Sequence, residues 1–107
     1  MIYLASPYSH PDPAVREARF DAVSRKAGEL MRAGWNVFSP ISHMHPIAVR
    51  GGLPLGWDFW QAYDREMISA CDSLMVFKLD GWKESKGVQA EIEIEQSLGL
   101  PVMYVPE

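Results

Sequence analysis

Short apolar runs alternate with longer amphipathic segments along this chain, and this alternation constrains the fold more than any other feature of the sequence. Proline, glycine or polar turns end the apolar runs, whereas the longer segments have apolar residues at helical spacing. Strands that alternate with helices form a parallel sheet with right-handed crossovers and helices on both faces. The predicted fold class is therefore α/β, a three-layer doubly wound sheet of the flavodoxin or Rossmann-like type.

The boundaries of the predicted elements come from helix caps and breakers. Asp12 followed by Pro13 is a helix N-cap with proline at the first helical position, and Gly34 follows the last turn of that helix. We expect four strands in the order 2-1-3-4. The predicted strands are residues 1–6, 35–39, 73–79 and 101–105, and the predicted helices are residues 13–33, 57–70 and 86–98.

Residues 41–56 are rich in histidine, glycine and proline and have no clear apolar period, so we expect a long connection there. Such connections in compact domains are usually functional or mobile. In a doubly wound sheet, ligands bind beyond the carboxyl ends of the strands, where the strand order reverses. We therefore expect the loops after Ser6, Ser39 and Leu79 to line a site, with residues 41–56 closing over it.

Composition limits the classes of protein to which the chain can belong. Its 107 residues are enough for one domain, which we assign to residues 1–107. The formal net charge of -4 argues against a nucleic acid polymer as the partner. The apolar N-terminal run is too short to span a membrane. The single cysteine, Cys71, forms no intramolecular disulfide and so favours a reducing compartment. We expect a cytoplasmic protein without a membrane partner.

Two carboxylates lie where apolar residues are expected. Asp64 falls on the apolar stripe of the helix at 57–70, and Glu91 falls within the apolar arc of the helix at 86–98. A buried carboxylate is costly unless it is paired or used in chemistry. Glu91 is also close to a helix N-terminus, which favours the ionised form that a nucleophile needs. The structural alternative places Asp64 at the edge of its stripe and lets Glu91 reach solvent between apolar neighbours.

The other acids of these helices have simpler interpretations. Glu95 lies inside the same arc as Glu91 but further from the helix N-terminus, and Glu93 lies outside it. Asp58 is in the first turn of its helix, where it complements the helix dipole. Glu91 is therefore the inward acid nearer to the expected site.

Polar side chains occur at two places in the predicted site, the start of the helix at 86–98 and the end of the first strand. Ser85 and Gly87 open the helix at 86–98, where they form either an anion site or an ordinary N-cap. Tyr3, Ser6 and Tyr8 bring hydroxyl groups to the end of the first strand. These residues are candidates for binding a small polar ligand.

The histidines raise the question of a metal. His43 and His45 are two residues apart, and His10 is a third candidate ligand. No further ligand is clearly placed beside them, so we predict neither a metal nor another cofactor.

Three sequence blocks, in this order, carry a resemblance to a known superfamily. They are Ile2-Tyr3-Leu4-Ala5-Ser6, then Asp64 with Asp72 eight residues on, and finally Ser85-Lys86-Gly87-Val88-Gln89-Ala90-Glu91 continuing to Gly99-Leu100-Pro101-Val102. With these blocks the chain resembles the nucleoside 2-deoxyribosyltransferase-like superfamily, which includes deoxyribonucleoside 5′-monophosphate N-glycosidases. Within that superfamily it resembles a small bacterial and phage branch. Members of the family often complete a pocket with residues from a neighbouring subunit, so the resemblance implies a homo-oligomer.

The resemblance implies a role for each matching residue. Glu91 matches the glutamate that attacks the anomeric carbon, Tyr3 the tyrosine that orients it, and Asp64 the aspartate near the base and the sugar. Ser85 matches a phosphate-contacting serine of the monophosphate hydrolases, where the transferases have an aspartate. This match favours hydrolysis over transfer. The glycine- and arginine-rich loop of those hydrolases is replaced here by Pro7-Tyr8-Ser9-His10.

The expected function is cleavage of the N-glycosidic bond of a nucleoside or nucleoside 5′-monophosphate. Glu91 would trap the oxocarbenium-like sugar, as in retaining glycoside hydrolysis. Asp64 or Asp58 would protonate the departing base or activate water. Aromatic rings near the site would stack on the base. The predicted substrate-binding residues are Ser6, Tyr8, Ser85, Gly87, Trp57, Asp58, Trp82 and His43.

Two other classes of function fit the sequence. One is a module that binds a nucleotide or nucleotide-sugar without turnover. The other is an assembly subunit, because the edge strands at 35–39 and 101–105 are able to pair across a homo-oligomer.

Overall fold

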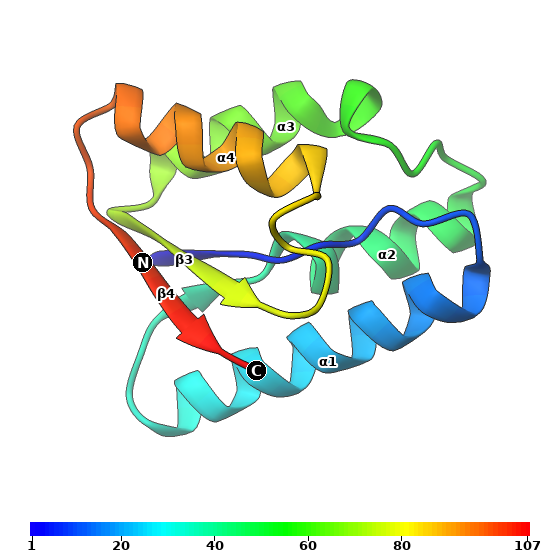
Figure 1. The fold of residues 1–107 in the computed structure, drawn as a ribbon, viewed down its shortest axis with the longest axis horizontal. Coiled ribbons are helices and arrows are strands. Elements are labelled where there is room, and N and C mark those ends of the chain that lie inside the picture. The colour runs from blue at the N-terminus through cyan, green and yellow to red at the C-terminus, as the bar shows by residue number, and fades with distance from the viewer.

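The computed structural model describes residues 1–107 and contains one four-stranded parallel sheet with helices on both faces (Figure 1). The strand order is β2-β1-β3-β4, which confirms the predicted order. The strands are β1 (Ile2–Ala5), β2 (Val37–Phe38), β3 (Ser73–Lys78) and β4 (Val102–Pro106), and the helices are α1 (Pro13–Arg32), α2 (Pro40–Gly51), α3 (Trp57–Ala70) and α4 (Lys86–Ser97).

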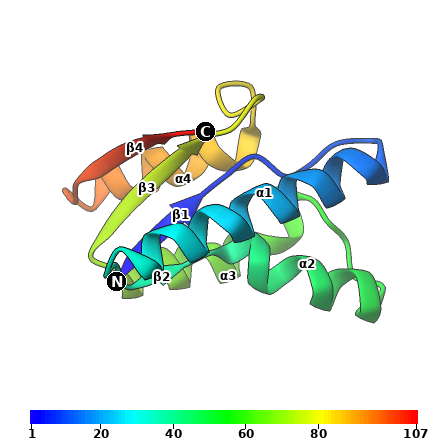
Figure 2. The ribbon, with the colours of Figure 1, turned by 90° about the horizontal axis from the view of Figure 1, so that it is seen from below.

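Alternate residues of the central strands build two cores. On β1, Ile2 and Leu4 face α1, whereas Tyr3 and Ala5 face α3 and α4. This is the two-residue period of a strand that is buried on both sides. The short helix α2 lies toward the carboxyl ends of the strands, next to α1 (Figure 2). The fold therefore surrounds that end of the sheet with α2 and with the starts of α3 and α4.

The prediction of a long connection at residues 41–56 is wrong, because most of this segment is α2. Ser39 caps the helix by accepting a hydrogen bond from the Ser42 backbone N–H, and Pro40 occupies the first turn. Met44 and Ala48, four residues apart, face inward and supply the missed helical period. Pro46, which removes a backbone N–H but does not end the helix, obscured that period.

The predicted strand at 35–39 shortens to two residues. Val37 and Phe38 pair with Ile2 and Tyr3, while Trp35 still belongs to the turn because its N–H binds the carbonyl of Leu30. The other boundaries agree with the prediction or differ by one residue, as helix and strand ends commonly do. None of the helices is both long enough and apolar enough to cross a membrane.

Candidate functional site

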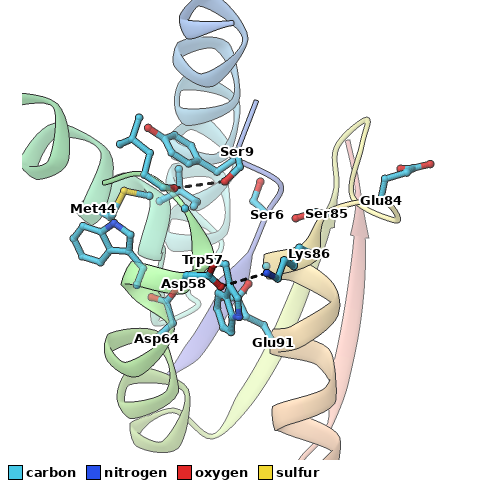
Figure 3. A pocket seen from close by; sticks show the side chains of 16 residues that line it. Ser6, Ser9, Met44, Trp57, Asp58, Asp64, Glu84, Ser85, Lys86 and Glu91 are labelled. Atoms are coloured by element: carbon cyan, nitrogen blue, oxygen red, sulfur yellow. Dashed lines mark hydrogen bonds and ion pairs between the residues drawn. The ribbon is translucent and has the colours of Figure 1, made fainter. Parts of the chain in front are cut away.

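A hollow of about 450 Å³ opens at the carboxyl ends of the strands (Figure 3). Its walls come from the loop after β1, from α2, from the segment leading into α3 and from the start of α4. Each of the three loops that we expected to line a site contributes to it. The lining residues are Ser6, Tyr8, Ser9, Ile41, Met44, Leu55, Gly56, Trp57, Asp58, Trp60, Asp64, Glu84, Ser85, Lys86, Gly87 and Glu91.

Glu91 lies at the inner end of this hollow, in the second turn of α4, and its side chain is only 5% exposed. The hydroxyl of Tyr3 donates a hydrogen bond to Glu91 Oε2. Burial raises the pKa of Glu91 to about 8, the negative charge of Asp64 adds to this rise, and the Tyr3 hydrogen bond opposes it. Burial thus acts against the ionised form of Glu91 that a place near the helix N-terminus favours.

Asp64 reaches the same hollow from α3 and is half-buried. Burial raises the pKa of Asp64 to about 6, against a smaller lowering by the nearby hydroxyl of Tyr3. Tyr3 is fully buried on β1, and burial raises the pKa of its phenol, with further rises from the charges of Glu91 and Asp64. The Tyr3 hydroxyl thus donates to Glu91 and lies close enough to Asp64 to affect its pKa. Since burial raises the pKa of Glu91 further than that of Asp64, the pair is expected to share one proton near neutral pH.

The start of α4 forms a polar end of the hollow. Ser85 caps the helix by accepting a hydrogen bond of 3.2 Å from the Val88 backbone N–H. Gly87 faces the ring of Trp57, where a Cβ atom would lie 3.8 Å from the indole. Ser6, from the loop after β1, has a buried hydroxyl without a hydrogen-bond partner. These groups leave hydrogen-bond donors directed at a place that a ligand can occupy.

An ion pair crosses the mouth of the hollow at this end. Lys86 Nζ lies 3.3 Å from Asp58 Oδ1, so the pair joins the starts of α4 and α3 (Figure 3). Both side chains are exposed, and such pairs are weak in water. Lys86 is the one cationic side chain among the lining residues.

The opposite wall is apolar and aromatic. Tyr8, Met44 and Trp60 belong to a small hydrophobic cluster separate from the two cores of the sheet. The indole N–H of Trp60 donates to the carbonyl of Pro54 at 2.8 Å. A wall of this kind suits the face of a planar heterocycle.

Three predicted site residues do not line the hollow: Tyr3, which contacts the lining residue Glu91 from behind the lining, and Trp82 and His43. Trp82 packs against the core between the sheet and α4, and its ring lies 5.7 Å from that of Tyr104. His43 stacks on Tyr63, with ring centroids 5.9 Å apart, and lies beside Phe38. Both side chains pack against neighbouring aromatic rings, and neither lines the hollow.

The three histidines do not share a site. His10 accepts from the Asp12 backbone N–H, whereas His45 is buried between the Tyr8 hydroxyl at 2.5 Å and the Glu17 carboxylate at 2.7 Å. No three side chains of histidine, cysteine, aspartate or glutamate gather as ligands for a metal ion.

Sequence reasoning missed the contribution of α2 and the lysine at the mouth. The spacing of Ile41, Met44 and Ala48, together with the Ser39 cap, is the signal that predicts α2 and hence its place in the wall. Lys86 was part of a recognised motif, but its ion pair depends on a residue 28 positions away. The missed lining residues are Ser9, Ile41, Met44, Leu55, Gly56, Trp60, Glu84 and Lys86.

A family model described as "Domain of unknown function (DUF1937)" matches residues 1–107. The chain belongs to this family. No curated protein matches the chain. For this DUF1937 domain, the function is therefore inferred from the hollow and from the groups that line it.

Proposed function

We propose that this DUF1937 domain cleaves the N-glycosidic bond of a nucleoside or nucleoside 5′-monophosphate, by hydrolysis rather than transfer, with Glu91 as the nucleophile. The observation that carries the proposal is the buried Glu91, hydrogen-bonded to Tyr3 and electrostatically coupled to Asp64, at the inner end of a hollow. The resemblance to the nucleoside 2-deoxyribosyltransferase-like superfamily supports the same roles for these three residues.

The shared proton of the two acids fits the first step of such a reaction. The C1′–N bond breaks, and its electron pair leaves with the base, which then needs a proton. Glu91 gives up its proton to Asp64 as positive charge develops on the sugar, and Asp64 passes it to the base. The carboxylate of Glu91 then forms a bond to C1′, as in retaining glycoside hydrolysis.

The second step releases the sugar. Water attacks C1′, the bond to Glu91 breaks, and Asp64 accepts the proton of the water. A carboxylate whose pKa is raised to about 6 is a better base near neutral pH than an ordinary aspartate. The Tyr3 hydroxyl stabilises the departing carboxylate of Glu91 by its hydrogen bond.

The remaining parts of the hollow fit the rest of a nucleotide. The base would lie against Tyr8, Met44 and Trp60, and a 5′-phosphate would lie at Ser6 and the start of α4. The N–H groups of a helix N-terminus and an unpaired buried hydroxyl favour such an anion. The other lining acids are exposed, and of these Asp58 is paired with Lys86.

A panel of nucleosides and their 5′-monophosphates, incubated with and without a second free base, tests the proposal. Released base is measured by chromatography. We expect base release in the absence of an acceptor, and its loss in Glu91→Gln. Base exchange that requires the second base would contradict hydrolysis, and release that survives Glu91→Gln would contradict the assignment of the nucleophile.

A binding module without turnover is the second candidate, and the raised pKa of Glu91 favours it, since a protonated acid does not attack carbon. In that case nucleotides raise the melting temperature, but no free base accumulates during long incubation. The same panel, followed by thermal unfolding, distinguishes the two candidates.

A further inference from the structure

A second hollow of about 370 Å³ adjoins the first. Ser9, Leu55 and Gly56 line both hollows, so the two meet along one shared edge. The Ser9 hydroxyl lies 3.5 Å from the carbonyl of Leu55 at this edge (Figure 3). The second hollow is completed by His10, Pro11 and Arg16. A ligand that crosses the shared edge therefore extends from Glu91 toward Arg16.

The two hollows differ in charge. Four carboxylates and one lysine line the first, whereas the second is lined by Arg16 and His10 without any carboxylate. Arg16 is half-buried, and its Nη1 donates to the carbonyls of His10 at 2.5 Å and Pro11 at 3.3 Å. No carboxylate forms an ion pair with this guanidinium, so its charge is free to meet an anion. Arginine in such a setting suits a phosphate, to which it presents several donors.

Three serine hydroxyls lie between the start of α4 and the edge that the two hollows share. Ser85, Ser6 and Ser9 follow one another from the start of α4 toward the shared edge (Figure 3). The Ser6 hydroxyl is buried, lines the first hollow and has no partner within the protein. An unsatisfied buried hydroxyl is costly, and a ligand oxygen at this place removes that cost.

We propose that the joined hollows bind a nucleotide with two linked phosphates, which run along Ser85, Ser6 and Ser9 toward Arg16. The sugar to be cleaved lies at Glu91, and whatever is attached beyond the second phosphate lies in the second hollow. A single phosphate at the start of α4 leaves the Arg16 guanidinium, which is held only by the carbonyls of His10 and Pro11, without an anionic partner. The inference rests on the proposed function only for the placing of the reacting sugar at Glu91.

Isothermal titration calorimetry on the full chain tests this proposal. The ligands are the 5′-monophosphates and 5′-diphosphates of the four common ribonucleosides, together with ADP-ribose. For at least one base, we expect the diphosphate to bind about tenfold tighter than the monophosphate or more, and Arg16→Gln to remove this preference. Glutamine keeps a donor for the loop carbonyls but loses the charge.

Arg25→Gln is the matched control. Arg25 lies on the same helix, is exposed and pairs with Asp21, so its loss changes the net charge equally without touching either hollow. We expect this variant to retain the preference for the diphosphate. Arg16→Lys keeps the charge and is expected to retain part of the preference for the diphosphate. If Arg16→Gln does not fold, the preference is compared between Arg16→Lys and the unchanged protein. The proposal is overturned if no diphosphate is preferred, or if both glutamine variants lose affinity equally.

Base release from the same samples separates this inference from the proposed function. Release that requires Glu91, without any preference for a second phosphate, overturns only the inference. Binding that depends on Arg16, without release of base from any ligand, supports the inference and overturns only the proposed cleavage.

Discussion

Two glutamates of α4, one helical turn apart, are both buried and yet have different surroundings. Glu91 is 5% exposed and Glu95 is fully buried, and burial raises the pKa of both carboxyl groups. Glu91 accepts a hydrogen bond from Tyr3 and lines the hollow, with the charge of Asp64 close by. Neither carboxyl oxygen of Glu95 has a hydrogen-bond partner, and this side chain lines neither hollow.

The comparison teaches that a buried acid does not by itself indicate a site. Both glutamates carry a cost of desolvation, which an unpaired carboxyl group avoids by staying protonated. Glu91 carries this cost of desolvation but also has a hydrogen-bond partner, a second acid nearby and space for a ligand beside it. At Glu95 no contact offsets it. We therefore expect substitution of Glu91 to change activity and substitution of Glu95 to change stability.

The largest expected effect is on base release in Glu91→Gln. Loss of the nucleophile is expected to lower the rate by more than about 10³-fold, because the covalent route is closed. The fold is expected to remain, since Gln is similar in size and still accepts from Tyr3. Circular dichroism and the rate of base release check both expectations. Glu95→Gln is the matched control. A comparable loss of activity in Glu95→Gln would contradict the claim that only Glu91 belongs to the site.

Tyr3→Phe is expected to have the next largest effect. The variant removes the hydroxyl that donates to Glu91. We expect a decrease in kcat of roughly 10- to 100-fold, as the loss of a charged hydrogen bond predicts. Since Tyr3 lowers the pKa of both Glu91 and Asp64, both limbs of the pH profile are expected to move to higher pH. An unchanged profile would show that Tyr3 acts only in packing.

The pH dependence itself is expected to be bell-shaped. Below about pH 6 both acids are protonated and no carboxylate is available, and above about pH 8 both are ionised and no proton is available for the base. The rate is expected to fall about tenfold per pH unit outside this range. Measurement of kcat/KM from pH 4 to 10 checks this expectation. A rate that keeps rising above pH 9 would contradict the shared proton.

The smallest effect on activity is expected for Glu95→Met. Replacing an unpaired buried carboxyl group with an apolar side chain of similar length is expected to raise the free energy of unfolding by about 1–3 kcal/mol. The folded pKa of Glu95 is raised, so the native protein loses stability as the pH rises above the unfolded value of 4.5. The gain from Glu95→Met is therefore expected to be larger at pH 8 than at pH 4 in urea unfolding.

The fold was largely predictable because its signals are local. Caps such as Asp12 and breakers such as Gly34 give the order of elements, and the rules for parallel sheets then give the strand order. The helix α2 was missed because Pro46 and the histidines obscure a period that Met44 and Ala48 carry. A cap at Ser39 was the local signal that indicated it.

The candidate site was predictable only in part. Helical spacing places both Glu91 and Glu95 inward and does not distinguish them, because the difference lies in Tyr3, 88 positions away along the chain. The raised pKa of Glu91 also depends on burial among other elements, a contribution that reasoning from the helix dipole does not include. The lysine at the mouth and the arginine of the second hollow likewise depend on how distant segments meet.

The most direct test of the central claim is to trap the sugar on the protein. A nucleoside with fluorine at C2′ slows release of a covalent intermediate, because fluorine destabilises the oxocarbenium-like transition state. After incubation, mass spectrometry of the intact protein and of its peptides locates the added sugar. The account predicts one sugar per chain, attached to Glu91 and absent from Glu91→Gln but present in Glu95→Gln. A sugar attached to another residue, or rapid base release without any adduct, would contradict it.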